Sequence, residues 1–164
     1  TFEEAAPAYA SLRAMGAARV SYLVPSRFAY GYGLSPAVVE AARDWQPDLI
    51  LTVDNGIAAV EGVARANELG IQVIVTDHHD LPEIPPPAQA ILNPKMLPAD
   101  HSLHELAGVG VAYLLARGLL TDPQHQAALN TMLDLVALGL IADVATQVGE
   151  VRYLIQRGLK WSQE

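Results

Sequence analysis

The chain has 164 residues, no cysteine, 51% hydrophobic residues and 17% charged residues. This length, with a mean hydropathy of +0.21, indicates one globular domain and excludes a disordered or polyelectrolyte chain. Eighteen Asp and Glu residues against ten Lys and Arg give a net charge of −8, which argues against a self-sufficient nucleic-acid clamp. The lack of cysteine excludes disulfides, thiol catalysis and zinc–thiolate sites.

No targeting or membrane segment is visible in the sequence. Every apolar run is interrupted well before the ~18 residues that a membrane-spanning helix needs. The N-terminal TFEEAAPAYA carries two glutamates where a secretory signal would carry positive charge. Because a cysteine-free chain also fits a reducing cytosol, we expect a cytoplasmic protein with no membrane partner.

The sequence of the first part of the chain predicts a helix, a strand and a second helix. The periodicity of Phe2–Met15 predicts a helix that ends at Gly16, and Val20–Val24 has the composition of a short strand. Glycines on both sides of Tyr32 indicate a flexible loop. Ser35-Pro36 predicts a helix start, with the serine as N-cap, for a helix that runs to about Asp44.

Two uninterrupted apolar runs then predict strands that are buried on both faces. They are Asp48–Val53 and Ile71–Thr76, and Ile57–Leu69 between them is expected to be helical. This strand–helix–strand order within about 30 residues is typical of a βαβ unit.

The second half of the chain is more helical. A stiff connector at 82–87 (PEIPPP) precedes a possible short strand at Ala90–Leu92. Helices are expected at Leu106–Leu120, Ala127–Ala142 and Val148–Leu159. The predicted fold class is α/β: an open, mainly parallel sheet with helices on both faces and a more helical C-terminal third.

Polar residues follow both predicted buried strands. Asp54 follows the first, and Asp77, His78 and His79 follow the second. Ligands of open parallel sheets bind beyond the carboxyl ends of the strands, so these residues would share one rim if the strands are neighbours. Carboxylates and imidazoles without thiolates suit Mn²⁺, Mg²⁺ or Zn²⁺. The alternative, that Asp54 only caps the following helix, stays open.

A third candidate ligand is Asp143, in the apolar stretch 135–144 (LVALGLIADV). We expect an unpaired carboxylate there to pay a desolvation penalty that a metal ion or buried hydrogen bonds would offset. Asp134 is a weaker candidate, for which a polar position on a helix flank is the favoured interpretation.

Five motifs in order give the chain a family resemblance. VTDHH (75–79) resembles the motif that names the DHH phosphoesterase superfamily. LTVDNGI (51–57) resembles its second metal motif and LDLVALGLIADV (133–144) its fourth. YLVPSRFAYGYGLS (22–35) and LAGVGVAYLL (106–115) narrow the match to the RecJ-like exonucleases specific for single-stranded DNA, over roughly residues 10–160.

The resemblance implies a site with two divalent metal ions, Mn²⁺ or Mg²⁺, held about 3.5–4 Å apart. It implies that Asp54 bridges the two ions, that His78 is a ligand and that Asp143 binds the second ion. His79 would lie beside the scissile phosphate, and Asp77 would orient the site from behind the ligands.

A loop with one arginine and three aromatic residues is the best substrate-binding candidate outside the metal centre. Arg27 can clamp a phosphate, and Phe28, Tyr30 and Tyr32 can stack on bases. An exposed loop arginine with inward-packed aromatics is an equally open interpretation.

Weaker candidates come from the second half. Gly108 and Gly110 precede a helix, where backbone N–H groups can approach phosphate, although close helix packing explains them as well. His101 and His104 stand at the spacing of a second metal site, but their polar surroundings favour a solvated loop.

The resemblance also implies what the chain does. It would be residues 1–164 of a single DHH-type catalytic domain, without the family's Asp-x-Asp motif and without its C-terminal substrate-binding domains. The expected activity is 5′→3′ exonuclease action on single-stranded DNA in DNA repair and recombination, weak or absent in this fragment. A single-strand-binding protein and a helicase are possible partners through the missing domains. Action on small nucleotides, oligoribonucleotides or pyrophosphate, or a non-catalytic role as a replication scaffold, remain alternatives.

Overall fold

The structure, a computed structural model, describes residues 2–161, and the side chains of these residues except 2–4, 27, 124, 126, 128 and 161. Its helices and strands follow one another as α1 (Phe2–Ala14), α2 (Arg27–Tyr30), α3 (Pro36–Arg43), β1 (Leu49–Val53), α4 (Val60–Glu68), β2 (Gln72–Thr76), β3 (Ala90–Leu92), the 3₁₀ turn η1 (Pro94–Met96), α5 (Gly108–Leu119), α6 (Pro123–Asn130), α7 (Leu133–Ala142) and α8 (Gly149–Trp161). Within residues 2–161, no helix combines the length and the apolar character that crossing a bilayer requires.

The three strands form one parallel sheet in the order β1-β2-β3. The register places Val53 opposite Thr76 and Thr76 opposite Leu92, so all three strands end at the same edge. The pairing continues one residue further, where the Asp54 N–H donates to the Thr76 carbonyl at 3.0 Å. The segments that follow β1 and β2 therefore begin side by side, as the sequence predicts.

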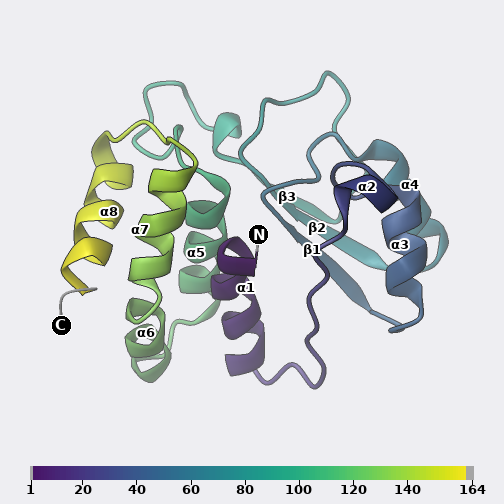
Figure 1. Ribbon diagram of the computed structural model, residues 1–164, viewed down its shortest axis with the longest axis horizontal. Coiled ribbons are helices and arrows are strands. Elements are labelled where there is room, and N and C mark those ends of the chain that lie inside the picture. Colours follow the sequence, from purple (N-terminus) through teal and green to yellow (C-terminus); the bar gives the residue numbers. More distant parts are fainter. Residues whose placement is uncertain (1, 162–164) are drawn as a thin grey trace.

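Helices cover both faces of the sheet (Figure 1). On one face, α3 and α4 pack on β2 through a buried cluster that includes Val39, Val63 and Val73. On the other face, α1 and α5 contact the sheet, and a second buried cluster joins α5, α6, α7 and α8. The α/β fold class with a helical C-terminal third is confirmed.

The predicted start of α3 is also confirmed. Ser35 has an extended backbone, and its Oγ accepts the N–H of Val38 at 3.4 Å, which satisfies one of the free donors at the helix start. Pro36 is the first helical residue, a position where its missing N–H is not needed.

Two predicted elements are wrong. Val20–Val24 is not a strand: the segment has an irregular backbone, and its side chains from Tyr22 to Val24 are exposed. Strand-forming residues need a pairing partner to become a strand. The single helix predicted at Ala127–Ala142 is two helices, α6 and α7, separated by a turn at residues 131–132.

Candidate metal centre

The edge where β1 and β2 end carries a close pair of metal-type ligands. Asp54 directly follows β1, and His78 lies two residues after β2. The Oδ1 atom of Asp54 lies 3.0 Å from Nε2 of His78. Asp54 has a φ of 60°, in the left-handed region that aspartate tolerates better than most residues.

Asp143, which follows α7 in the helical half of the chain, joins this pair. Its Oδ2 atom lies 3.6 Å from Nε2 of His78, so the structure brings a carboxylate of the C-terminal helices to the sheet edge. The desolvation argument for Asp143 is wrong, because its side chain is 42% exposed. Its apolar neighbours Leu138 and Ile141 are exposed as well. Spatial convergence with His78, not burial, singles Asp143 out.

The backbone at the end of α7 holds Asp143 in this place. The N–H groups of Val144 and Ala145 donate to the carbonyls of Ile141 and Leu140 at 3.1 and 3.2 Å, the two bonds that close many helix ends. Val144 takes the position usually given to glycine, with a φ of 54°, which strains a β-branched residue. Asp143 is the C-cap, where the helix dipole disfavours negative charge by about 0.3–1 kcal/mol unless a cation is near.

Asp77 lies behind the ligands and is 1% exposed. Its Oδ2 accepts the N–H of Ile57 at 2.9 Å, and its Oδ1 accepts the N–H groups of His78 and His79 at 2.7 and 3.2 Å. Oδ1 also lies 2.6 Å from Nδ1 of His79. Since a carboxylate only accepts, Nδ1 carries the proton and Nε2 of His79 faces outward. This is the arrangement expected of a residue that orients the site.

The donor set fits a divalent cation. Ligand atoms of Asp54, His78 and His79 all lie within 4.8 Å of one another. The Oδ1 atom of Asp54 is buried and, among the described residues, accepts no well-aligned hydrogen bond, although Nε2 of His78 is in contact with it. A buried carboxylate oxygen without such a bond is costly, and a cation would offset the cost. Mixed carboxylate and imidazole donors suit Mn²⁺ and similar ions.

The N-terminus of α5 closes the site behind Asp54. A Cβ atom on Gly108, the first residue of the helix, would lie 2.3 Å from Oδ1 of Asp54. Only glycine therefore allows the helix to approach this closely. The N-cap, Ala107, has no side chain to satisfy the first N–H groups, so the positive end of the helix dipole faces the carboxylate.

The pKa of His78 is perturbed by its neighbours in the site. The contact with Asp54 raises the pKa of His78 above 6.5, and the charges of Asp143 and Asp77 add to the effect. Burial works in the opposite direction, because it disfavours the charged imidazolium. Without metal, the site therefore favours a protonated His78 paired with Asp54.

This pairing predicts a pH dependence in the metal-free chain. A folded-state pKa above the unfolded value makes the pair's contribution to stability complete below about pH 6.5, and it is lost as pH rises through the folded pKa. Replacing Asp54 by asparagine should lower the pKa of His78 toward its ordinary value. An NMR titration of the His78 ring measures this shift. Asp48→Asn, at the other end of β1, is the control and should leave the His78 titration where it is.

The segment with the predicted phosphate clamp lies beside the site, but its residues Arg27–Tyr30 form the short helix α2 rather than a loop. The side chain of Arg27 is outside the described residues, so its phosphate contact stays a prediction. Phe28 and Tyr32 are exposed. The alternative interpretation, in which the aromatic side chains pack inward, is therefore wrong for these two residues. The hydroxyl of Tyr32 lies 3.5 Å from Nε2 of His79. The sequence did not predict this contact, and the glycines on both sides of Tyr32 are the feature of the sequence that comes nearest to indicating it.

The remaining candidates have structural explanations. A Cβ atom on Gly110 would lie 2.4 Å from the side chain of Leu106, so close packing accounts for this glycine, and its phosphate contact stays a prediction. Asp134 lies in the first turn of α7, where its Oδ1 accepts a neighbouring backbone N–H. His104 contacts Glu105 at 2.9 Å in an irregular loop, and the described residues there form no cluster with metal-ligand spacing.

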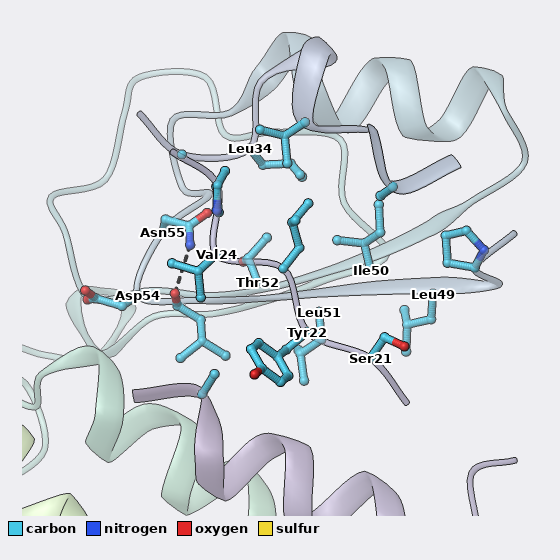
Figure 2. Close-up of a pocket in the computed structure, with 18 of the residues that line it drawn as sticks. Ser21, Tyr22, Val24, Leu34, Leu49, Ile50, Leu51, Thr52, Asp54 and Asn55 are labelled. Carbon is cyan, nitrogen blue, oxygen red and sulfur yellow. Dashed lines mark hydrogen bonds between the residues drawn. The ribbon is translucent and has the colours of Figure 1, made fainter. Parts of the chain in front are cut away.

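A groove of about 350 Å³ runs along the outer edge of β1 and reaches Asp54. Figure 2 shows its walls: the segment with Ser21, Tyr22 and Val24 on one side and β1 on the other. Within the described part of the chain, β1 pairs with β2 alone, so its backbone N–H and C=O groups on this side have no strand partner.

The fold and the site together define a class of protein: an open parallel α/β domain with an Asp/His metal-type centre beyond its strand ends. The chain belongs to the DHH family, because the model of the "DHH family, N-terminal domain" matches residues 5–140.

Curated relatives at high identity are single-stranded-DNA-specific exonucleases named RecJ. The protein of Salmonella typhimurium LT2 is 47% identical over 158 residues, which cover 90% of this chain and 27% of the relative. The protein of Escherichia coli K12 is 44% identical over 159 residues, or 91% of this chain and 28% of the relative. The chain thus spans about a quarter of the length of these relatives.

Solved structures agree with these relatives. A crystal structure of the exonuclease RecJ bound to manganese matches 96% of this chain and 40% of its own, with a TM-score of 0.82 and 34% identity. RecJ from Thermus thermophilus, in complex with Mn²⁺, matches 96% of this chain and 22% of its own, with a TM-score of 0.71 and 33% identity.

Proposed function

We propose that this chain is the catalytic-core segment of a metal-dependent exonuclease that acts on single-stranded DNA. The observation that carries the proposal is the convergence of Asp54, His78, His79 and Asp143 at one edge of the sheet. The names of the relatives supply the substrate, and the manganese in the matched structures supports a divalent ion. We thus propose together the reaction, which is hydrolysis, the substrate, which is single-stranded DNA, and the cofactor, which is a divalent ion.

Each site residue has a role in the proposal. Asp54, His78 and Asp143 would hold the metal, two divalent ions of the type Mn²⁺ or Mg²⁺. His79 would donate from a protonated Nε2 to a phosphate oxygen, while its Nδ1–H stays bonded to Asp77. When bound, the ions supply an activated water and stabilise negative charge on the attacking and leaving oxygens.

Substrate contacts would come from the loop and from α5. Arg27 would bind a phosphate, and the N–H groups near Gly108 and Gly110 would approach another at the positive end of the helix. The exposed rings of Phe28 and Tyr32 favour a nucleic acid with unpaired bases over pyrophosphate, because pyrophosphate offers nothing to stack.

Activity is expected to need further segments, which the longer relatives have room to supply. Three or four ligands from this chain are few for two ions. Among the described residues β1 has no strand partner on its outer edge, along which the groove reaches Asp54. A strand that pairs with this edge in parallel would end beside Asp54, and an Asp-x-Asp stretch at its end would complete the ligand set. Further domains that bind DNA would also explain how a chain with a net charge of −8 can act on single-stranded DNA.

Metal binding can be tested on the chain itself. Titration with Mn²⁺, followed by the EPR signal of the free ion, should show binding that Asp54→Asn and His78→Ala each weaken by at least about tenfold. Asp48→Asn should leave it unchanged. Equal binding by all four proteins would contradict the assigned ligands.

Nuclease activity can be tested in a hybrid in which this chain replaces the matching segment of Escherichia coli RecJ. The hybrid should degrade single-stranded DNA in Mn²⁺, and His78→Ala should lower its kcat by at least about a hundredfold. Undiminished activity of the His78→Ala hybrid would favour a scaffold role for this segment. Robust Mn²⁺-dependent digestion by the 164-residue chain alone would contradict the need for further segments.

A further inference from the structure

The contacts of Tyr32 lead to one further residue of the site. Its hydroxyl lies 3.5 Å from Nε2 of His79, the nitrogen that Asp77 leaves facing outward. The two rings also meet edge to face, with centroids 6.3 Å apart and planes at 85°. The sequence separates these residues by 47 positions, so the contact is made by the fold.

We propose that Tyr32 is a positioning residue for His79, an inference that rests on the function proposed above. Asp77 fixes only one nitrogen of the His79 ring, and the side chain of His79 is 45% exposed. A ring held by one hydrogen bond, with the centroid of the His78 ring 4.6 Å away, can still tilt about that bond. The Tyr32 hydroxyl bonds to the second nitrogen, as donor while Nε2 carries no proton and as acceptor once Nε2 is protonated and faces the phosphate. The edge of the Tyr32 ring limits the tilt, so Asp77 and Tyr32 together set the direction of Nε2.

The loop around Tyr32 is built to hold the residue in this place. Gly31 and Gly33 have φ values of 78° and 73°, which other L-residues rarely adopt. A Cβ atom at either position would meet nothing within 4 Å, so backbone conformation, not space, accounts for glycine at both positions. The two glycines turn the chain so that Tyr32 points from this exposed loop toward the end of β2.

Positioning differs from base stacking in what the hydroxyl does. If Tyr32 only stacks on a base, Tyr32→Phe keeps the stacking surface and nothing changes. If Tyr32 positions His79, loss of the hydroxyl alone frees the ring. His79 then has the productive orientation toward the phosphate in a smaller fraction of the enzyme–substrate complexes. This lowers kcat and leaves KM nearly unchanged.

The direct test uses the metal-free 164-residue chain and does not depend on activity. At about pH 8.5, where an unperturbed imidazole is neutral, ¹⁵N NMR of the His79 ring should show a protonated Nδ1 and an Nε2 that accepts a hydrogen bond. Tyr32→Phe should shift the Nε2 resonance downfield. Tyr153→Phe is the matched control, since it removes a hydroxyl that accepts a hydrogen bond from Arg157 at 2.9 Å, on α8. An Nε2 resonance that Tyr32→Phe leaves unmoved, or a proton on Nε2, would overturn the proposal.

A kinetic test in the RecJ hybrid separates this inference from the proposed function. Tyr32→Phe should lower kcat about threefold to tenfold with little change in KM, as expected for one lost hydrogen bond, and Tyr153→Phe should change neither. A hybrid active on single-stranded DNA with the same kcat for Tyr32→Phe would overturn the positioning role and leave the proposed function intact. An inactive hybrid would count against the proposed function, while the NMR result still decides the contact.

Discussion

Replacing Asp77 by alanine is expected to lower the free energy of unfolding by about 3–5 kcal/mol. The Asp77 carboxylate, 1% exposed, accepts three backbone N–H groups and the Nδ1–H group of His79. These bonds tie the segment after β1 to the segment after β2. Alanine would leave the N–H of Ile57, a buried residue, without an acceptor, and it would release both histidines from their backbone anchors.

Chemical denaturation followed by circular dichroism measures this loss, and Asp80→Ala is the matched control. Asp80 is exposed three residues further along the chain, so the same chemical change should alter stability by no more than about 0.5 kcal/mol. Asp77→Asn should fall between the two, because one amide oxygen still accepts while the amide group cannot. If Asp77→Ala and Asp80→Ala lose the same stability, Asp77 does not tie the two segments together.

The parts of the fold that the sequence predicted are those with a local signal. The positions of β1 and β2 follow from two uninterrupted apolar runs. β2 is mostly buried as predicted, but β1 is only partly buried and its Leu49 is exposed, so the predicted burial of β1 on both faces is wrong. The start of α3 follows from a side-chain hydrogen bond that Ser35 makes within its own turn. In each case the cause of the structure lies within a few residues of the element.

The two wrong elements depended on something other than local composition. Val20–Val24 has strand-forming side chains, but in the structure a groove lies between it and β1, and within the described residues it pairs with no strand. The apolar spacing of Leu129, Leu133 and Val136 continues across the break between α6 and α7, so periodicity does not reveal that the backbone turns there. Pro123, the first residue of α6, was the better signal for where that helix begins.

The candidate site shows the same division. Asp54 and the Asp-His-His sequence could be placed at one rim from strand order alone, because parallel strands end together. That Asp143 reaches His78 from the end of α7 depends on how the helical half packs against the sheet. The same holds for the contact between Tyr32 and His79. The burial argument for Asp143 failed, and its role as a metal ligand stays a prediction of the family resemblance.

Replacing Gly108 by alanine is expected to weaken Mn²⁺ binding by about tenfold to a hundredfold. The added Cβ atom would lie 2.3 Å from Oδ1 and 2.6 Å from Cβ of Asp54, distances that real atoms do not tolerate. Asp54 has little room to give way, because its N–H is bonded to the Thr76 carbonyl and its backbone is already in the left-handed region. Either the carboxylate turns away from His78 or α5 moves away from the sheet, and both separate the ligands.

Gly118→Ala is the control for this change, since Gly118 lies in the same helix and a Cβ there meets nothing within 4 Å. Alanine in that position should raise stability by about 0.5–1 kcal/mol and leave Mn²⁺ binding unaltered. A second measurement needs no metal: Gly108→Ala should lower the raised pKa of His78, because the Asp54 carboxylate that raises it has moved. An unchanged His78 titration together with unchanged Mn²⁺ affinity would show that the approach of α5 to Asp54 does not set the geometry of the site. The opposite result would make the first residue of α5 a determinant of metal affinity, although it offers the ion no side-chain ligand.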